Sequence, residues 1–474
     1  MNPAEHVYDN DGHTRGTTHA GSVEPRQPGD SVDRQSPDNS ASAMRPADGT
    51  KRVTTTPDES PFRVGRQRRY RGRMAHRPPQ SALAVHWSLE PETVFLNHGS
   101  FGATPSVVLD AQMDFRRQME REPVRFFVRE LDGLLATTRT SLGALLHCDA
   151  DDLALVPNAT TGVNSVLRSL RFAPGDELLC TDHEYNACRN TLDYVAQSHG
   201  ATVVVARVPY PIARASDVTD AILGLVTPRT RIALVDHVTS QTALVFPIAD
   251  IVRALAQRGV DTVVDGAHAP GMLPLDLRAI GAAYYTGNCH KWLCAPKGAA
   301  FLYVRRDRQD AIRPTVISHG ANAPLSGRRR FRLEFDWMGT DDPTAWLCIP
   351  AAIDFLSSVL PGGLHEVMER NRAGALAARS VLCAALRESP SCPDNMVGAI
   401  AAVPLPDGSP DSPTSPFLLD PLQDTLFVED GIEVPVIPWP APPKRLLRVS
   451  SQLYNSLAQY EYLAERVVAR LRGV

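Results

Sequence analysis

Hydrophobic and polar positions follow two different periods along the chain from Val94 onward. Short runs rich in β-branched residues are followed by stretches in which apolar residues recur at helical spacing. This alternation is typical of βα units that build a mostly parallel sheet. Helices at Gly162–Leu170 and Ile248–Arg258 are expected to connect successive strands. The pattern predicts strands at Leu153–Pro157, Glu177–Thr181, Thr202–Val208, Ile232–Asp236, Thr262–Asp265 and Ala300–Val304.

The N-terminal end has a different pattern. Residues 1–80 are rich in Asp, Ser, Thr, Pro, Gly and Arg and show no sustained period, so we expect a disordered arm. Within it, Arg63–Arg77 contains seven arginines and no acidic residue. A solvated tail is the simpler interpretation of this stretch, and a nucleic-acid or phosphate patch is the alternative. Met74 is an alternative start of translation, because globular-looking sequence follows it at once.

The C-terminal part is predicted to form a smaller α+β unit. After Trp346, helical spacing covers Ile353–Leu360 and Val367–Leu386 and then gives way to a proline-rich region from Pro390 to Pro443. A mobile loop is expected near Pro404–Pro416. The expected division is the arm 1–80, an N-terminal segment 81–124 that packs on the small domain, a large domain 125–338 and a small domain 339–474.

Composition narrows the class of partner. The 474 residues are 43% hydrophobic, and 49 basic residues nearly balance 53 acidic ones, so a small-molecule ligand is favoured over nucleic acid or a membrane. The apolar runs are far shorter than the roughly 20 residues of a transmembrane helix. Eight scattered cysteines form no CxxC pair, which indicates reduced thiols and no metal site. We therefore expect a cytoplasmic protein.

One lysine stands out by its surroundings. Lys291 lies between the apolar stretch Ala282–Tyr285 and an expected strand, where desolvation lowers the pKa of an ammonium group and frees the amine for imine formation. Asp265 ends a central expected strand, where open α/β sheets bind ligands. Such an aspartate can keep a pyridine nitrogen protonated, which makes the ring an electron sink. A helix cap is the alternative role of Asp265.

A candidate phosphate turn follows another expected strand. Thr160 and Thr161 stand at the start of a helix, where free N–H groups and the positive end of the helix dipole suit a phosphate. Asn288 and His290, beside the lysine, are candidate donors to the same phosphate. An ordinary N-cap is the alternative role of Thr160.

Together these residues resemble the class V aminotransferase family of enzymes dependent on pyridoxal 5'-phosphate (PLP), which has fold type I. Within it they are most similar to the isopenicillin N epimerase-like branch, which includes cysteine desulfhydrases and C–S lyases. The resemblance implies a mostly parallel sheet in a large α/β domain and a smaller C-terminal α+β domain. It runs from about Thr93 to the C-terminus and rests on the segments Phe95–Pro105, Asn158–Gly162, Asp182–Asn186, Asp236–Ser240, Asp265–His268, His290–Lys291 and Gly339–Asp342.

The resemblance also implies how PLP is held. Lys291 would form the Schiff base, Asp265 would pair with the pyridine nitrogen, and His183 would stack on the ring, with Tyr185 as the rival for stacking. Ser240 and His268 would contact the ring hydroxyl. Gly339 and Thr340 resemble the segment that reaches the phosphate from a neighbouring subunit, which implies a homodimer. The residues implied for the phosphate are Thr160, Thr161, Asn288 and His290.

On the substrate side, Arg448 resembles the family's carboxylate anchor, because a planar guanidinium can bind a carboxylate through two parallel hydrogen bonds. Arg445 and Arg332 are alternatives that could share this role. Asn97 and His98 resemble the loop that lines the substrate pocket, although His98 could instead cap the following helix.

The predicted first step is removal of the α-proton of an amino-acid substrate by Lys291. Return of the proton to the opposite face gives epimerisation, loss of a β-substituent gives a C–S lyase or cysteine desulfhydrase, and protonation at the cofactor gives transamination. We rank them in that order. No cysteine follows Cys392, which disfavours a persulfide-forming desulfurase. A catalytically silent binding module is the alternative from a different class.

Overall fold

The computed structural model describes residues 77–410 and 420–473, which belong to one compact unit. Almost all of the predicted arm 1–80, Met74, the arginine-rich stretch before Arg77 and the second half of the loop expected near Pro404–Pro416 lie outside the described residues.

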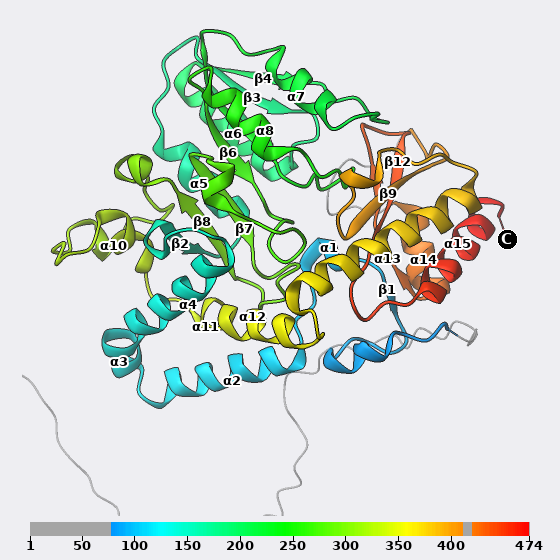
Figure 1. Ribbon diagram of the computed structural model, residues 1–474, viewed down its shortest axis with the longest axis horizontal. Helices are drawn as coiled ribbons and strands as arrows, with labels where there is room; N and C mark the ends of the chain where they lie inside the picture. Colours follow the sequence, from blue (N-terminus) through cyan, green and yellow to red (C-terminus); the bar gives the residue numbers. More distant parts are fainter. Residues whose placement is uncertain (1–76, 411–419, 474) are drawn as a thin grey trace, which may run out of the picture. The chain divides into compact units, whose positions relative to one another are not determined.

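A seven-stranded sheet forms the centre of the large domain, in the order β2-β8-β7-β6-β5-β3-β4 (Figure 1). Its neighbouring pairs from β7 to β4 are parallel, whereas β8 is antiparallel to both β7 and β2. The predicted α/β fold with a mostly parallel sheet is therefore confirmed. The strands are β2 (Leu153–Val156), β3 (Glu177–Thr181), β4 (Thr202–Ala206), β5 (Thr230–Asp236), β6 (Asp261–Asp265), β7 (Tyr284–Asn288) and β8 (Ala300–Val304).

Both faces of this sheet are apolar, because successive strand residues enter different cores. Val263 packs in a core with helices α5 (Ala159–Ser169) and α6 (Asn186–His199), while Val264 packs in a core with α4 (Leu131–Leu145), α7 (Ser216–Leu223), α8 (Ile248–Ala256) and α12 (Ile349–Ser358). Burial on both faces explains why these strands read as continuous apolar runs in the sequence.

A smaller antiparallel sheet, in the order β11-β12-β9, forms the C-terminal part. Its strands are β9 (Ile400–Leu405), β11 (Val436–Pro438) and β12 (Arg445–Ser450), and they pack with the helices α13 (Gly363–Leu386), α14 (Pro421–Asp430) and α15 (Leu457–Leu471) (Figure 1). The proline-rich region thus contains regular elements, because its prolines fall mainly between them or at strand and helix ends.

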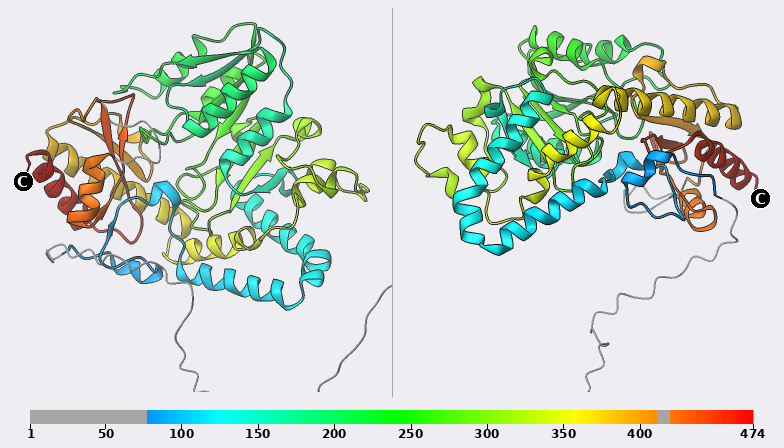
Figure 2. Two further views of the ribbon diagram at one scale, coloured as in Figure 1. Left: turned by 180° about the vertical axis from the view of Figure 1, so that it is seen from behind. Right: turned by 60° about the horizontal axis from the view of Figure 1, so that its bottom comes forward.

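The N-terminal segment connects the two parts. Strand β1 (Val94–Phe95) pairs in parallel with β10 (Ile432–Glu433) of the C-terminal part. Helix α2 (Ser106–Arg121) contacts α11 (Thr344–Leu347) and α12, and the two views of Figure 2 show these helices side by side. Since α11 and α12 share a core with α4, residues 344–358 pack with the large domain although they follow residue 338.

The remaining elements are short. No single helix in the described part of the chain is long and apolar enough to cross a membrane; the pair Thr344–Ser358 and Gly363–Leu386 meets the length and composition together but is bent by 74° at its break. The short elements are η1 (Ala82–His86), α1 (His98–Phe101), α3 (Pro123–Arg125), η2 (Phe126–Glu130), η3 (Ala150–Asp152), α9 (Leu277–Ile280), η4 (Arg306–Ala311), η5 (His319–Ala321), α10 (Arg330–Asp336) and η6 (Asp394–Met396).

Candidate active site

The candidate site lies at the carboxyl end of the central parallel strands. Asp265 is the last residue of β6, where its register partners are Asp236 on β5 and Thr286 on β7. The buried Asp265 carboxylate accepts a hydrogen bond from the Ala267 backbone N–H at 2.9 Å and one from the Cys188 thiol at 3.1 Å. Burial raises the pKa of Asp265, whereas these two donors lower it.

Lys291 follows β7 and reaches back to the segment after β6. Its Nζ lies 3.0 Å from His268 Nε2, and the Trp292 indole N–H donates to His268 Nδ1 at 3.4 Å. Because Nδ1 accepts a hydrogen bond, we assign the imidazole proton to Nε2. That proton can be donated only to a lysine that is an uncharged amine.

The electrostatics of the site agree with a neutral amine. Burial lowers the pKa of Lys291 from 10.5 to about 7, with a further lowering from the nearby guanidinium of Arg448 and a partial opposing effect of Asp265. Burial and the charge of Lys291 also hold the pKa of His268 well below its ordinary value. At neutral pH a large fraction of Lys291 is therefore available as a nucleophile or a base.

Arg448 enters the site from the small sheet, on β12. Its NH1 donates to the Ser240 carbonyl at 2.6 Å and to the Ser240 hydroxyl at 3.2 Å, and its NH2 donates to the Ser100 hydroxyl at 2.8 Å. The buried Nε–H has no hydrogen-bond partner among the residues that the structure describes. Burial lowers the pKa of Arg448 to about 10, so it stays charged at neutral pH. It can therefore bind an incoming anion.

The two alternative arginines are held elsewhere. Arg445 NH1 donates to both carboxylate oxygens of Asp420, at 2.8 and 3.0 Å. Arg332 pairs with Asp151 and with Asp336. Within the described residues, neither of these guanidinium groups contacts Lys291. Arg448 is therefore the better candidate to bind a substrate carboxylate.

The predicted phosphate turn forms the start of α5. Asn158, not Thr160, is its N-cap: Asn158 Oδ1 accepts from the Thr161 N–H at 2.8 Å and from the Thr161 hydroxyl at 3.0 Å. The Ala159 N–H donates to Asn288 Oδ1 at 2.8 Å, which ties the turn to the end of β7. His290 Nδ1 lies 3.1 Å from the Ala299 carbonyl. These residues gather in one place, and their contacts to a phosphate stay a prediction.

A cavity of about 280 Å³ opens beside this turn. Thr161 lines it together with Gly339 and Thr340 of the same chain, which are both exposed. Gly339 has a φ of +124°, a conformation that favours glycine. The contact of Gly339 and Thr340 with the phosphate of a neighbouring subunit stays a prediction.

His183 is fully buried: its Nδ1 lies 2.6 Å from the Thr242 hydroxyl, its Nε2 lies 3.3 Å from the Val208 carbonyl, and its ring contacts Trp439 at 4.7 Å between centroids. The stacking role of His183 stays a prediction. Tyr185 is 42% exposed, and its phenol is close enough to Asp265 and Arg448 for their charges to act on it. Tyr185 is therefore the better candidate for a residue beside the cofactor.

The two residues predicted to line the substrate pocket have supporting contacts instead. His98 is fully buried, with Nδ1 2.9 Å from the Tyr454 hydroxyl and Nε2 3.0 Å from the Lys291 carbonyl, so it holds the lysine backbone, and its contact with a substrate stays a prediction. Asn97 donates to Glu433 at 3.0 Å and accepts from the Ser100 hydroxyl at 2.5 Å. Asn97 thereby orients Ser100, the partner of Arg448.

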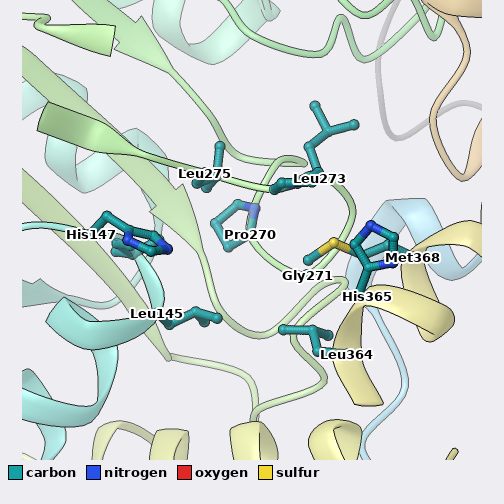
Figure 3. A pocket seen from close by; sticks show the side chains of 11 residues that line it. Leu145, His147, Pro270, Gly271, Leu273, Leu275, Leu364, His365 and Met368 are labelled. Carbon is teal, nitrogen blue, oxygen red and sulfur yellow. The ribbon is translucent and has the colours of Figure 1, made fainter. Parts of the chain in front are cut away.

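A second cavity, of about 190 Å³, holds none of the predicted site residues. Figure 3 shows Pro270 and Leu273 facing Leu364 and Met368 across it. Its lining is largely apolar and carries none of the groups that hold Lys291 or Asp265. The cluster around Lys291 therefore remains the candidate active site.

Several residues of this site were not predicted for it. Ser100, Glu184 and Cys188 lie in or next to the segments that carried the family resemblance, but their side-chain roles depend on contacts across the fold. A charged residue at the end of an apolar strand is a signal that the sequence does contain. This signal would have identified Asp236.

Comparison with known proteins decides the family. A model of the aminotransferase class-V family matches residues 94–391. The chain belongs to the aminotransferase class-V family. Isopenicillin N epimerase of Streptomyces clavuligerus is 34% identical over 80% of this chain and 96% of its own length, and that of Amycolatopsis lactamdurans is 36% identical over 80% and 95%. A probable chloroplastic L-cysteine desulfhydrase of Arabidopsis thaliana is 30% identical over 81% and 84%.

Solved structures of this family share the fold. A C-DES mutant with glycine covalently linked to its PLP cofactor matches with a TM-score of 0.65 and 22% identity, over 79% of this chain and 96% of that one. The cysteine desulfurase CsdA of Escherichia coli matches with a TM-score of 0.66 and 20% identity, over 82% and 98%. At these identities the likeness shows fold type I. The protein is a PLP-dependent class-V enzyme, and the family implies amino-acid substrates.

The residues at the site fit PLP. They provide a partly buried lysine amine with a lowered pKa, a buried aspartate at a strand end, the start of a helix tied to β7, and a charged arginine with an N–H that is unpartnered within the described residues. A lysine amine, an acid and the N-terminal end of a helix are the groups that suit an aldehyde, a pyridine nitrogen and a phosphate.

Proposed function

We propose that this enzyme epimerises the α-carbon of an amino-acid substrate with a free carboxylate. The observation that carries the proposal is the position of Lys291 Nζ, 3.0 Å from His268 Nε2, in a pocket that lowers the pKa of the lysine to about 7. Such an amine can accept and return a proton near neutral pH. The similarity to two isopenicillin N epimerases over nearly their whole length supports epimerisation in particular.

Lys291, Asp265 and the turn at Thr160 and Thr161 would hold PLP, with Asn288 and His290 beside the turn. When bound, PLP supplies an electron sink for negative charge at the α-carbon.

The protein's own groups have two tasks during turnover. Arg448 binds the substrate carboxylate with a charge-assisted pair of hydrogen bonds and so fixes the orientation of the α-carbon. Lys291 accepts the α-proton at Nζ, and His268 holds that amine in place through its Nε2. The Lys291 backbone is fixed in turn because its carbonyl accepts a hydrogen bond from Nε2 of buried His98.

Epimerisation needs a second proton-transfer group, and we propose Tyr185 for it. Asp265, Cys188 and Arg448 act electrostatically on both Tyr185 and Lys291, so both side chains lie near the same three residues. Burial and the nearby Cys188 and Asp265 raise the pKa of the Tyr185 phenol, so it keeps the proton that it would donate.

A C–S lyase is the second candidate, because relatives that include L-cysteine desulfhydrases are 28–34% identical to this chain. A lyase that forms a persulfide on a cysteine is disfavoured. Burial raises the pKa of all eight thiols, to about 12 for Cys294, so none is an activated thiolate. We also propose that the enzyme is a homodimer and that it is located in the cytoplasm. Both proposals hold for either reaction.

The test is turnover of a panel of L- and D-amino acids in deuterium oxide. An epimerase incorporates deuterium at the α-carbon and converts each enantiomer of its substrate into the other, while a lyase releases pyruvate or a thiol. Tyr185→Phe is expected to keep exchange with one enantiomer and lose conversion to the other; Tyr194→Phe, on an exposed tyrosine of α6, is the matched control. Elimination products with no α-deuterated amino acid would refute the epimerase and favour the lyase.

A further inference from the structure

Three carboxyl groups gather where β3, β5 and β6 end. Asp265 ends β6, Asp236 is its register partner at the end of β5, and Glu184 follows β3. Their exposed fractions are 2%, 3% and 6% in that order. The reaction needs only Asp265, so the presence of two more buried acids calls for an explanation.

The three carboxyl groups differ in their donors. Asp265 accepts hydrogen bonds from the Ala267 N–H and the Cys188 thiol. Both oxygens of Glu184 and Oδ2 of Asp236 are buried without any donor partner. These two carboxyl groups are instead within hydrogen-bonding distance of each other. Two carboxylates cannot hydrogen bond to each other unless one of them is protonated.

No nearby cation balances three negative charges. The other titratable groups around the pair are Cys180 of β3 and Cys188 and Arg189 of α6, while Lys291 acts on Asp265 from the other side. Arg189 is itself bound to both oxygens of Asp193 through Nε, at 3.0 Å each. Burial raises the pKa of Glu184 and of Asp236 well above the ordinary values, with added repulsion from Asp265 on both and from Glu184 on Asp236.

We propose that Glu184 and Asp236 share one proton and act as positioning residues of the cofactor site. The cluster then carries two negative charges instead of three. Asp265, which has both donors, stays the ionised member that pairs with the pyridine nitrogen of PLP. The single negative charge of the pair also strengthens the attraction of Asp265 for a proton on that nitrogen. This second step rests on the role of Asp265 proposed above, whereas the shared proton does not.

A bound cation is the alternative to a proton. Donor atoms of Glu184, Cys188 and Asp265 lie within 4.8 Å of one another, a spacing that a metal ion could bridge. The contacts favour the proton, because the Cys188 thiol donates to Asp265 and a metal would need the thiolate instead. The pKa of Cys188 is raised well above its ordinary value by burial and by Asp265, which opposes loss of that hydrogen.

Infrared spectroscopy of the full-length apoprotein tests the shared proton. We expect a carboxylic-acid C=O band at neutral pH that shifts on exchange into deuterium oxide and on labelling of either glutamate or aspartate with carbon-13. Glu184→Gln and Asp236→Asn keep the side-chain volume, and each is expected to abolish the band because the amide donates to the remaining carboxylate. Asp250→Asn, at an exposed carboxylate of α8, is the control that keeps it.

Nitrogen-15 NMR of ring-labelled PLP bound to the same proteins tests the positioning role. Each single variant keeps one negative charge on the pair, so the pH at which the ring nitrogen loses its proton should equal that of the wild type. The double variant carries none, and this pH should fall by about one unit, the scale expected for one charge at close range.

The outcomes separate the parts of the proposal. A wild-type apoprotein without the band, or a band that survives either single substitution, overturns the shared proton. A metal bound at one ion per chain and lost in Glu184→Gln overturns it in favour of a cation. A double variant with an unchanged nitrogen titration overturns the positioning role. None of these readouts depends on whether the enzyme proves to be an epimerase or a lyase.

Discussion

Substitution of Gly102 by alanine is expected to distort the backbone at His290 and Lys291, although these residues lie far from Gly102 in the sequence. Gly102 has a φ of +74° and a ψ of 164°, and it follows the helix α1. A Cβ at this position would lie 2.0 Å from the His290 carbonyl oxygen and 3.0 Å from the Lys291 Cα. The colliding atoms are backbone, so no side-chain rotation can relieve the contact.

The expected cost has two parts. A non-glycine residue in this region of backbone conformation costs about 1–3 kcal/mol. An overpacked contact costs about another 1–3 kcal/mol. Gly102→Ala should therefore lower the free energy of unfolding by about 2–6 kcal/mol. It should also weaken PLP binding, because the backbone at His290 and Lys291 must shift to make room for the Cβ.

Gly259→Ala is the matched control, since Gly259 also has a φ of +74° but open space around the position of a Cβ. Urea unfolding of both apoproteins, with PLP titrations of both, gives the comparison. The reasoning is refuted if the two substitutions lower the free energy of unfolding equally and Gly102→Ala binds PLP like the wild type.

Four further predictions concern the site. Lys291→Ala should abolish the borohydride-sensitive visible absorption of the bound cofactor and lower kcat by about 10²–10⁴-fold, as measured by absorption spectra and steady-state rates. With a lysine pKa of about 7, stopped-flow uptake of PLP by the apoprotein should accelerate as the pH rises through about 7 and then level off, because only the free amine reacts; a flat profile would contradict the assigned pKa. The lowered pKa of Lys291 reduces the free energy of unfolding of the apoprotein. This loss is complete below pH about 7 and shrinks as the pH approaches 10.5. Lys291→Met should therefore raise the free energy of unfolding, measured in urea, more at pH 6 than at pH 10. Arg448→Lys should raise KM about 10- to 100-fold for loss of a paired hydrogen bond, while Arg445→Lys should not; equal KM values would exclude Arg448 as the anchor.

The central sheet could be predicted from the sequence because its strands are apolar on both faces. The strand β7 was missed, since its second half, Thr286-Gly-Asn288, is polar and resembles a turn. Its polar residues are explained by the site: the Thr286 hydroxyl donates to the Phe301 carbonyl at 2.8 Å, and Asn288 Oδ1 accepts the first N–H of α5.

The site residues were predictable as segments but not always as side chains. The contrast between His183 and Tyr185 depends on how the turn after β3 is wound, which buries His183 and leaves Tyr185 exposed. The role of His98 was hidden for another reason. Its two partners lie 193 and 356 positions away in the chain, a separation at which local patterns carry no information.

The hydrogen bonds of Arg448 have a consequence for substrate choice. In this structure NH1 donates to Ser240 and NH2 donates to Ser100, one from the large domain and one from the N-terminal segment. A substrate carboxylate that binds through NH1 and NH2 together competes with these serines, and only an anion offers a stronger acceptor than a hydroxyl or a carbonyl. Amines without a carboxylate would leave the serines in place. Arg448 thus exchanges a serine hydrogen bond for one to the substrate carboxylate. Simple amines do not drive this exchange, so they are poor substrates.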